Sequence, residues 1–310
     1  MEIIFLGTSS AVHSKDRNQV SVAVKAFGKV MLFDCGEGTQ RQMLHTKVSP
    51  MKISKIFITH FHGDHILGLP GLIQSLGLHG RDEKLIIYGP KGLHKVRDAI
   101  LDFGYCKYEY PLEFIEIEPG IIEETEKYII RCQSVRHNVP ALAYSIEEKK
   151  KPRFLREKAI ELGVPVGPLF SKLHNGEEIE IDGKIIKPEQ VLGEPRKGIK
   201  LTYSGDTRPC EEMIDLAKDS TILIHESTFT RQDEENAEEH GHSTAADAAY
   251  IAKQSNCKEL ILTHISTRYN GEFSKIILNE AQEIFENTKI AYDFMEMEVK
   301  WYYECTDNWW

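Results

Sequence analysis

The sequence predicts a layered α/β fold, and three observations support this class. Short apolar runs with the composition of β-strands fill the first half of the 310-residue chain. Helical patterns separate these runs and continue in the second half. The hydrophobic content of 41% and charged content of 28% are those of a globular protein that can bury a full core. Strand groups with helices on their outer faces are typical of layered α/β architectures.

The expected elements follow in chain order. Residues 1–6 form a first strand and lack the basic leader of a signal peptide. Further strands are expected at residues 20–24, 30–33, 56–59, 85–88, 128–132, 141–146, 201–205 and 260–263. Helices are expected at residues 66–76, 92–103, 211–217, 244–254 and 273–285.

Composition bears on the cellular compartment and on the kind of metal site that the chain can form. No apolar run reaches the roughly 20 residues of a membrane helix, and the least charged stretch, 66–80, is broken by Gly and Pro. The six cysteines have no C-x-x-C spacing, which predicts reduced thiols and no cysteine metal site. We therefore expect a cytoplasmic protein with no membrane partner. The cysteines are Cys35, Cys106, Cys132, Cys210, Cys257 and Cys305.

A metal-binding turn follows the strand at 56–59. His60, His62, Asp64 and His65 lie within six residues, in the pattern H-x-H-x-D-H. Imidazole nitrogen and carboxylate oxygen are ligands of Zn²⁺, Fe and Mn. Alternate residues of an extended turn point the same way, so His60 and His62 can share one ion while Asp64 and His65 face a second. A solvated loop that is His-rich by chance is the alternative, but this pattern is more demanding than a single His pair.

Three more ligand-type residues occur in one recurring context. His137, Asp206 and His264 each follow an apolar strand at the point where it becomes a loop. Taken singly, such a residue is more often a hydrogen-bonded surface group or part of a turn than a ligand. The repetition of the context favours ligands.

These residues resemble the metallo-β-lactamase superfamily, and further motifs narrow the similarity to the ribonuclease Z family, the tRNA 3′-processing endonucleases. The resemblance runs from residue 1 to about residue 269, and the chain length fits the family's short form. It implies a four-layer αββα sandwich of two sheets, with helices outside and a protruding tRNA-binding arm. The motifs are Leu32-Phe33-Asp34-Cys35-Gly36-Glu37-Gly38-Thr39-Gln40, Ser204-Gly205-Asp206-Thr207-Arg208-Pro209, His225-Glu226-Ser227-Thr228-Phe229, His242-Ser243-Thr244 and Leu262-Thr263-His264-Ile265-Ser266-Thr267-Arg268-Tyr269.

The resemblance also implies the ligand sets and the reaction. One Zn²⁺ is assigned to His60, His62 and His137, and the other to Asp64, His65 and His264, with Asp206 bridging both. Mn²⁺ and Fe²⁺ use the same ligand types and are possible substitutes. Two such ions can lower the pKa of a water and offset charge on the phosphate. Cleavage after the discriminator nucleotide of a tRNA precursor would leave a tRNA 3′-hydroxyl and a trailer 5′-phosphate. Asp64 is a secondary candidate for accepting the proton of the water.

His242 is the candidate general acid for the leaving 3′-oxygen. Ser243 is expected to be the N-cap of the helix from Thr244, which would fix the place of His242. Glu226 would hydrogen-bond His242 and keep it protonated. On the residues alone, without the resemblance to the family, a histidine in the loop that caps the helix is the more frequent interpretation of His242.

Residues 149–198 are expected to form an arm inserted into a single domain that covers residues 1–310. Its first part, 149–172, carries seven basic and two acidic residues in a chain of net charge −10. A basic patch on an acidic protein is typical of binding to phosphate-rich ligands, although lysine runs are also common in solvated tips. Residues 163–169 resemble the Gly-Pro segment of the family's arm, which grips the tRNA body.

Two further expectations depend on the family alone. Ser14-Lys15-Asp16-Arg17-Asn18 resembles a loop that meets the tRNA 3′ end, although His13 stands where the family has Pro. The family also implies a homodimer, with apolar residues of the helix at 66–76 at the interface.

Two other functions are weighed against this reading. One is a different metallo-β-lactamase-like hydrolase that acts on a thioester, lactone, sulfate ester or small phosphodiester. The other is an RNA-binding or scaffold protein with an inactive metal site, which predicts missing ligands, whereas all seven are present.

Overall fold

The computed structural model describes residues 1–102, 109–194 and 196–299, which form two compact units. The first unit comprises Met1–Glu124, Ile129–Glu147 and the chain from Ile199 onward. The second comprises Thr125–Tyr128 and Glu148–Gly198. The predicted Cys106, Cys305 and the end of the helix at 92–103 lie outside the described residues.

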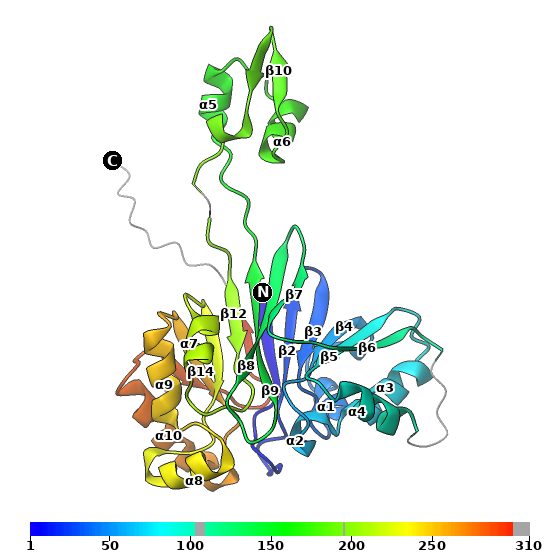
Figure 1. Ribbon diagram of the computed structural model, residues 1–310, viewed down its shortest axis with the longest axis vertical. Coiled ribbons are helices and arrows are strands. Elements are labelled where there is room, and N and C mark those ends of the chain that lie inside the picture. The colour runs from blue at the N-terminus through cyan, green and yellow to red at the C-terminus, as the bar shows by residue number, and fades with distance from the viewer. Residues whose placement is uncertain (103–108, 195, 300–310) are drawn as a thin grey trace. The chain divides into compact units, whose positions relative to one another are not determined.

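Two seven-stranded sheets form the centre of the first unit (Figure 1). The first sheet has the order β16-β1-β2-β3-β4-β5-β6, with antiparallel pairs up to β3 and parallel pairs from β3 to β6. Its strands are β1 (Glu2–Gly7), β2 (Ser21–Ala26), β3 (Lys29–Phe33), β4 (Ile53–Phe57), β5 (Leu85–Gly89), β6 (Leu112–Glu116) and β16 (Glu296–Glu298).

The second sheet has the order β15-β14-β13-β12-β9-β8-β7, and its strands from β12 to β15 are parallel. The strands are β7 (Gly120–Glu124), β8 (Tyr128–Val135), β9 (Ala141–Glu148), β12 (Lys200–Tyr203), β13 (Ile222–Glu226), β14 (Glu259–Thr263) and β15 (Thr288–Ile290). Loops after β8, β12 and β14 carry His137, Asp206 and His264. Because the carboxyl ends of parallel strands meet at one edge, the last two residues are brought together there.

Helices cover the outer face of each sheet (Figure 1). Beside the first sheet lie α1 (Thr39–Met43), α2 (Gly63–Ile66), α3 (Leu69–Leu78) and α4 (Leu93–Leu101); beside the second lie α7 (Glu211–Ala217), α8 (Glu234–His240), α9 (Ala245–Gln254) and α10 (Ser274–Gln282). An apolar core fills each helix–sheet interface. Between the sheets, the Phe33 ring lies 6.0 Å from that of Tyr144 and 5.5 Å from that of Tyr203. This arrangement confirms the predicted αββα sandwich.

The second unit has a small core of its own. It contains α5 (Arg156–Glu161), α6 (Pro168–His174), the hairpin β10 (Ile179–Ile181) and β11 (Lys184–Ile186), and a 3-10 turn at Pro188–Gln190. Its buried residues are Ala159, Val164, Leu173, Ile179, Ile186 and Val191. Five of its basic side chains, Lys151, Arg153, Arg156, Lys158 and Lys172, are exposed.

The predicted helix at 66–76 is wrong in its start and continuity. The structure has two helices there, α2 and α3, with Gly68 between them. Pro70 has no N–H to donate to the carbonyl of Ile66, so one helix cannot run through. The apolar side chains of α3 expected at a dimer interface are largely in the core, since Leu69, Leu72, Ile73 and Leu76 are buried; Leu78 is 82% exposed.

Other predictions agree with the structure more closely. The helix at 211–217 is α7 with the same bounds, and the remaining predicted strands and helices differ from those described by a few residues at their ends. Cys35, Cys132, Cys210 and Cys257 are buried free thiols, as expected. None of the described helices is both long and apolar enough to span a lipid bilayer.

Candidate metal centre and active site

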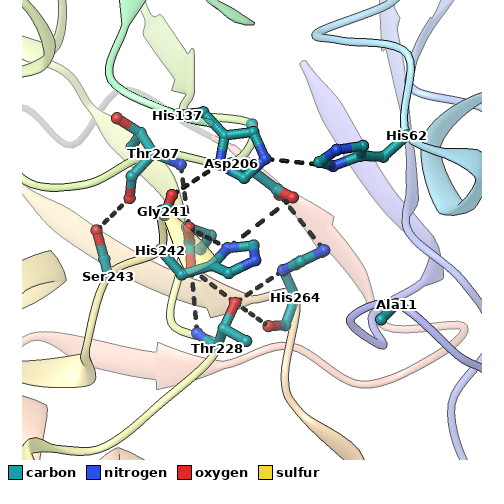
Figure 2. Close-up of polar contacts among 12 residues, drawn as sticks. Ala11, His62, His137, Asp206, Thr207, Thr228, Gly241, His242, Ser243 and His264 are labelled. Atoms are coloured by element: carbon teal, nitrogen blue, oxygen red, sulfur yellow. Dashed lines mark hydrogen bonds and ion pairs between the residues drawn. The ribbon is translucent and has the colours of Figure 1, made fainter. Parts of the chain in front are cut away.

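Three imidazoles converge at the first ligand group. His60 and His62 extend from the loop after β4, and His137 comes from the loop after β8. The Nδ1 atom of His62 lies 3.0 Å from Nε2 of His60 and 3.2 Å from Nε2 of His137. Figure 2 shows His62 and His137 facing each other across this space. Three ring nitrogens this close together are a donor set that could hold a cation.

A second group adjoins the first through Asp206. Oδ2 of Asp64 lies 3.6 Å from Nε2 of His65 and 3.4 Å from Nε2 of His264. The two carboxylate oxygens of Asp206 lie 3.5 Å from His60, 3.2 Å from His65 and 3.4 Å from His264. The structure thus brings together all seven ligand-type residues named from the sequence, with Asp206 between the two groups.

In four of the histidines, Nδ1 makes a hydrogen bond to a residue outside the ligand groups. Such outer partners fix the orientation of a metal-binding imidazole and raise its basicity. The contacts to Nδ1 are Thr59 Oγ1 to His60 at 3.0 Å, Asp34 Oδ2 to His65 at 2.9 Å, Thr228 Oγ1 to His264 at 2.9 Å and the Gly241 carbonyl to His137 at 2.7 Å. In each case Nε2 is left to face the centre.

Asp34 was not assigned a role from the sequence, although it lies in a quoted motif. It is fully buried directly after β3 and has a left-handed φ of 55°. Its carboxylate accepts hydrogen bonds from the Thr59 backbone N–H at 2.8 Å and the Tyr203 hydroxyl at 2.9 Å, besides holding His65. The position of Asp34 between an apolar strand and a Gly-rich loop could have marked it as a candidate. Its hydrogen-bond partners could not be predicted, because they lie far away in the sequence.

The electrostatics of the cluster fit a bound cation. Burial lowers the pKa of His60 well below its ordinary value, so this imidazole is neutral, which is the form that binds metals. Burial raises the pKa of Asp206, but His264 and His65 outweigh it and hold the carboxyl ionised. Nε2 of His65 and Oδ1 of Asp206 are buried and make no well-aligned hydrogen bond among the described residues, although they lie 3.2 Å from Oδ2 of Asp206 and 3.4 Å from Nε2 of His264. Unpaired buried donors and acceptors are costly, and a divalent cation bound by these atoms would remove that cost.

His242 and Glu226 form a hydrogen-bonded pair beside the cluster. Nδ1 of His242 donates to Oε1 of Glu226 at 2.8 Å. Glu226 is fully buried in β13 and also accepts from the Thr207 backbone and from Thr228. Burial lowers the pKa of His242, but the Glu226 carboxylate raises it to about 9. His242 is therefore protonated at neutral pH, with Nε2 not used by Glu226.

The expected capping role of Ser243 is wrong. Thr244 is the N-cap of α9, since its hydroxyl accepts from the backbone N–H of Asp247 at 3.2 Å and the Asp247 carboxylate accepts from the backbone N–H of Thr244 at 2.9 Å. Ser243 instead donates to the Thr207 carbonyl at 2.6 Å, as Figure 2 shows. This bond ties the loop after Asp206 to the segment that carries His242.

A cleft of about 520 Å³ opens beside the cluster. Its lining includes His62, Asn138, Phe229, His242 and Arg268. A substrate in this cleft would contact His62 of the first ligand group and His242.

The N-terminal loop at 14–18 borders a different cavity of about 410 Å³. Within the loop, the Arg17 guanidinium points inward and donates to Thr8 Oγ1 and the Ala291 carbonyl, both at 2.7 Å. Lys15 and Asp16 are exposed. Arg17 therefore fixes the loop, and the exposed residues are those available to a ligand.

Comparisons with known proteins agree with the fold and the site. A family model described as a beta-lactamase superfamily domain matches residues 186–265, and one described as anti-Pycsar protein Apyc1 matches residues 1–113. The structure of the short form of human tRNase Z superposes with a TM-score of 0.69 at 27% identity, covering 97% of this chain and all of that one.

Full-length relatives give the family. The ribonuclease Z of Methanothermobacter thermautotrophicus is 52% identical over 308 residues, covering 99% of this chain and 100% of the relative. That of Bacillus subtilis is 43% identical over 304 residues, covering 96% and 99%. The chain therefore belongs to the ribonuclease Z family, hydrolases of the metallo-β-lactamase fold that process the 3′ ends of tRNA.

Proposed function

We propose that this enzyme removes the 3′ trailer of tRNA precursors, cutting after the discriminator nucleotide to leave a tRNA 3′-hydroxyl and a trailer 5′-phosphate. The observation that carries the proposal is the convergence of seven ligand-type side chains beside a hydrogen-bonded His242–Glu226 pair. The relatives named ribonuclease Z support the substrate class.

The ligand groups are proposed to hold two Zn²⁺ ions, with Mn²⁺ and Fe²⁺ as substitutes. His60, His62 and His137 would hold one and Asp64, His65 and His264 the other, with Asp206 shared between them. The nitrogen and oxygen donors and the unpaired buried atoms of His65 and Asp206 support this assignment. Such ions would supply a water of lowered pKa and positive charge opposite the scissile phosphate.

The proton for the leaving group is proposed to come from His242. As the bond between phosphorus and the 3′-oxygen breaks, the proton on Nε2 of His242 passes to that oxygen, and the water oxygen remains on the trailer phosphate. Glu226 stabilises the imidazolium before the transfer and orients its ring. Asp64 is held by the Ala11 backbone N–H at 2.8 Å and is a secondary candidate for accepting the proton of the water, because a metal-bound carboxylate is a weak base.

A tRNA precursor with a mapped cut tests the whole proposal. The enzyme is incubated with a precursor that carries a 3′ trailer, and both product ends are identified. We expect one cut after the discriminator, with the phosphate on the trailer. A thioester, lactone or small phosphodiester turned over far faster than the precursor would instead favour another metallo-β-lactamase-like hydrolase. Tight tRNA binding without turnover by the metal-loaded protein would favour an RNA-binding protein.

Residues 149–198 are proposed to be a tRNA-binding arm inserted into a single domain. The exposed Arg153, Arg156 and Lys158 in and before α5 support this role, because each neutralised phosphate releases a counterion.

Replacing Arg153, Arg156 and Lys158 together by Ala should weaken tRNA binding and flatten its dependence on salt. These side chains are exposed and lie outside the core of the second unit, so folding should be kept. Affinity for the precursor is measured across a salt series, beside hydrolysis of a small chromogenic phosphodiester that lacks the tRNA body.

The matched control removes exposed acidic charge from the same unit, with Glu177 and Glu178 replaced by Ala. Its tRNA affinity should stay equal or rise. An unchanged salt slope in the basic variant, or equal loss of both activities, would reject the binding role.

Glu226→Gln should lower the pKa of His242, because a neutral amide no longer stabilises the imidazolium. The protonated form is the active acid, so the alkaline fall of the tRNA cleavage rate should move to lower pH. The pH dependence of kcat is the measurement. If Glu226 acts through His242, the double variant with His242→Ala should be scarcely slower than His242→Ala alone. Additive losses would separate the two residues.

The homodimer and the cytoplasmic location stay predictions. With most apolar side chains of α3 in the core, the exposed Leu67 and Leu78 are the residues of this region that a second copy can reach. Sedimentation of the full chain measures the assembly state.

A further inference from the structure

The C-terminal carbonyl groups of α8 are bound by side chains from two other loops. Nε and Nη2 of Arg208 donate to the Glu238 carbonyl at 3.0 and 2.6 Å. Nδ2 of Asn138 donates to the Glu239 carbonyl at 3.0 Å, and Nδ1 of His137 to the Gly241 carbonyl at 2.7 Å. The last carbonyls of a helix have no partner within it, so these side chains satisfy groups at the end of α8 that the helix itself leaves open.

Arg208 also ties together the loops that carry three site residues. Its Nη2 donates to Oδ1 of Asn138 at 2.9 Å, and its backbone N–H bonds the Arg136 carbonyl at 2.6 Å. Arg208 lies two residues after Asp206, and Asn138 directly follows His137. One guanidinium thus joins the Asp206 loop, the His137 loop and the turn before His242.

The turn at Gly241 lies so close to the loop of His137 that there is no room for a side chain between them. Gly241 has a left-handed φ of 78°, and a Cβ on it would lie 2.9 Å from Nδ1 of His137 and 3.0 Å from the backbone nitrogen of Asn138. The next residue is His242, whose N–H bonds the Ala237 carbonyl at 2.8 Å. Figure 2 shows Gly241 between His137 and His242. The place of the His242 ring therefore depends on the end of α8.

We propose that Arg208 and Asn138 are positioning residues that hold the end of α8 so that His242 meets the leaving oxygen. This inference rests on the proposed function, in which His242 is the acid. The Arg208 guanidinium is directed at the Glu238 carbonyl and at Oδ1 of Asn138. In this proposal Arg208 acts on His242 by holding the turn at the end of α8, and its positive charge does not contact the substrate.

Arg208→Ala and Arg208→Lys separate geometry from charge. Lys keeps the positive charge, but its single nitrogen cannot reproduce the fork that bonds both Glu238 and Asn138. We expect both variants to lower kcat for the tRNA precursor by about 10–100-fold with little change in KM. A small diester with a nitrophenolate leaving group needs no acid and should lose much less. Combined with His242→Ala, neither should slow cleavage much further.

Hydrogen exchange provides a readout that does not depend on activity. In both Arg208 variants and in Asn138→Ala, backbone amides of residues 234–242 should exchange faster, while those of α9 stay protected. Arg136→Ala is the control, because its exposed guanidinium pairs only loosely with Glu212 at 3.8 Å. It removes the same charge from the facing segment and should change neither exchange nor leaving-group dependence.

The outcomes separate this inference from the function on which it rests. Full rescue of tRNA cleavage by Arg208→Lys would identify a charge contact with RNA and overturn the positioning role, as would unchanged exchange in all three variants. Faster exchange together with a His242→Ala variant that slows good and poor leaving groups equally would show that Arg208 and Asn138 hold the end of α8, but it would reject His242 as the acid and with it their positioning role in catalysis.

Discussion

Asp206→Ala should lose bound metal and activity together. Its two oxygens lie within 3.5 Å of nitrogens from His60, His65 and His264, so among the described residues it is the side chain that approaches both ligand groups. Removing it takes away a ligand and also leaves the surrounding imidazoles without their central negative charge. The loss should exceed that from substituting any single histidine. Metal content by elemental analysis and cleavage of a tRNA precursor are measured on the same preparation.

Two further variants serve as controls for Asp206→Ala. Asp206→Asn keeps the size of the side chain but not its charge, and should also lose metal. Asp215→Ala removes an exposed carboxylate from α7 nearby in the sequence and should keep both metal and activity. Two equivalents of metal and normal cleavage in Asp206→Ala would show that the ligand assignment is wrong.

His242→Ala should keep its metal and cut tRNA precursors about 10²–10⁴-fold more slowly, the usual contribution of a general acid. The seven ligand-type residues and the basic surface of the second unit remain intact, so substrate binding should change little. Single-turnover rates are compared for the tRNA precursor and for a diester with a nitrophenolate leaving group. The second substrate should be much less affected, because its leaving group departs without a proton.

The control is His94→Ala, which removes an exposed imidazole from α4. Loss of metal from His242→Ala would make His242 a ligand, an arrangement that its 3.9 Å distance from Asp206 allows. Equal slowing of both substrates would make it a structural residue.

Local patterns determined the fold class and the choice of residues. The alternation of strand and helix patterns fixed the layered α/β class, because each periodicity is a property of neighbouring residues. The pattern around His60 and the strand ends before His137, Asp206 and His264 identified the ligand-type residues. Residue type and the end of a strand can both be recognised from neighbouring residues. The break between α2 and α3 was not predicted, and the N-cap of α9 was placed at Ser243 and not at Thr244, because a helix end depends on a few local hydrogen bonds that the apolar periodicity does not report.

Tertiary structure alone decided what holds these residues. Asp34 is 31 positions from His65, Thr228 is 36 from His264, and Gly241 is 104 from His137. No local periodicity links such pairs, because their contacts form only when loops from separate parts of the chain, such as those after the neighbouring strands β3 and β4 or β13 and β14, come together at the end of a sheet. Arg208 and Asn138 read as ordinary loop residues for the same reason. The sequence by itself determined which residues meet at the candidate site, and the packing of the strand-end loops and of α8 determined how each ring is oriented.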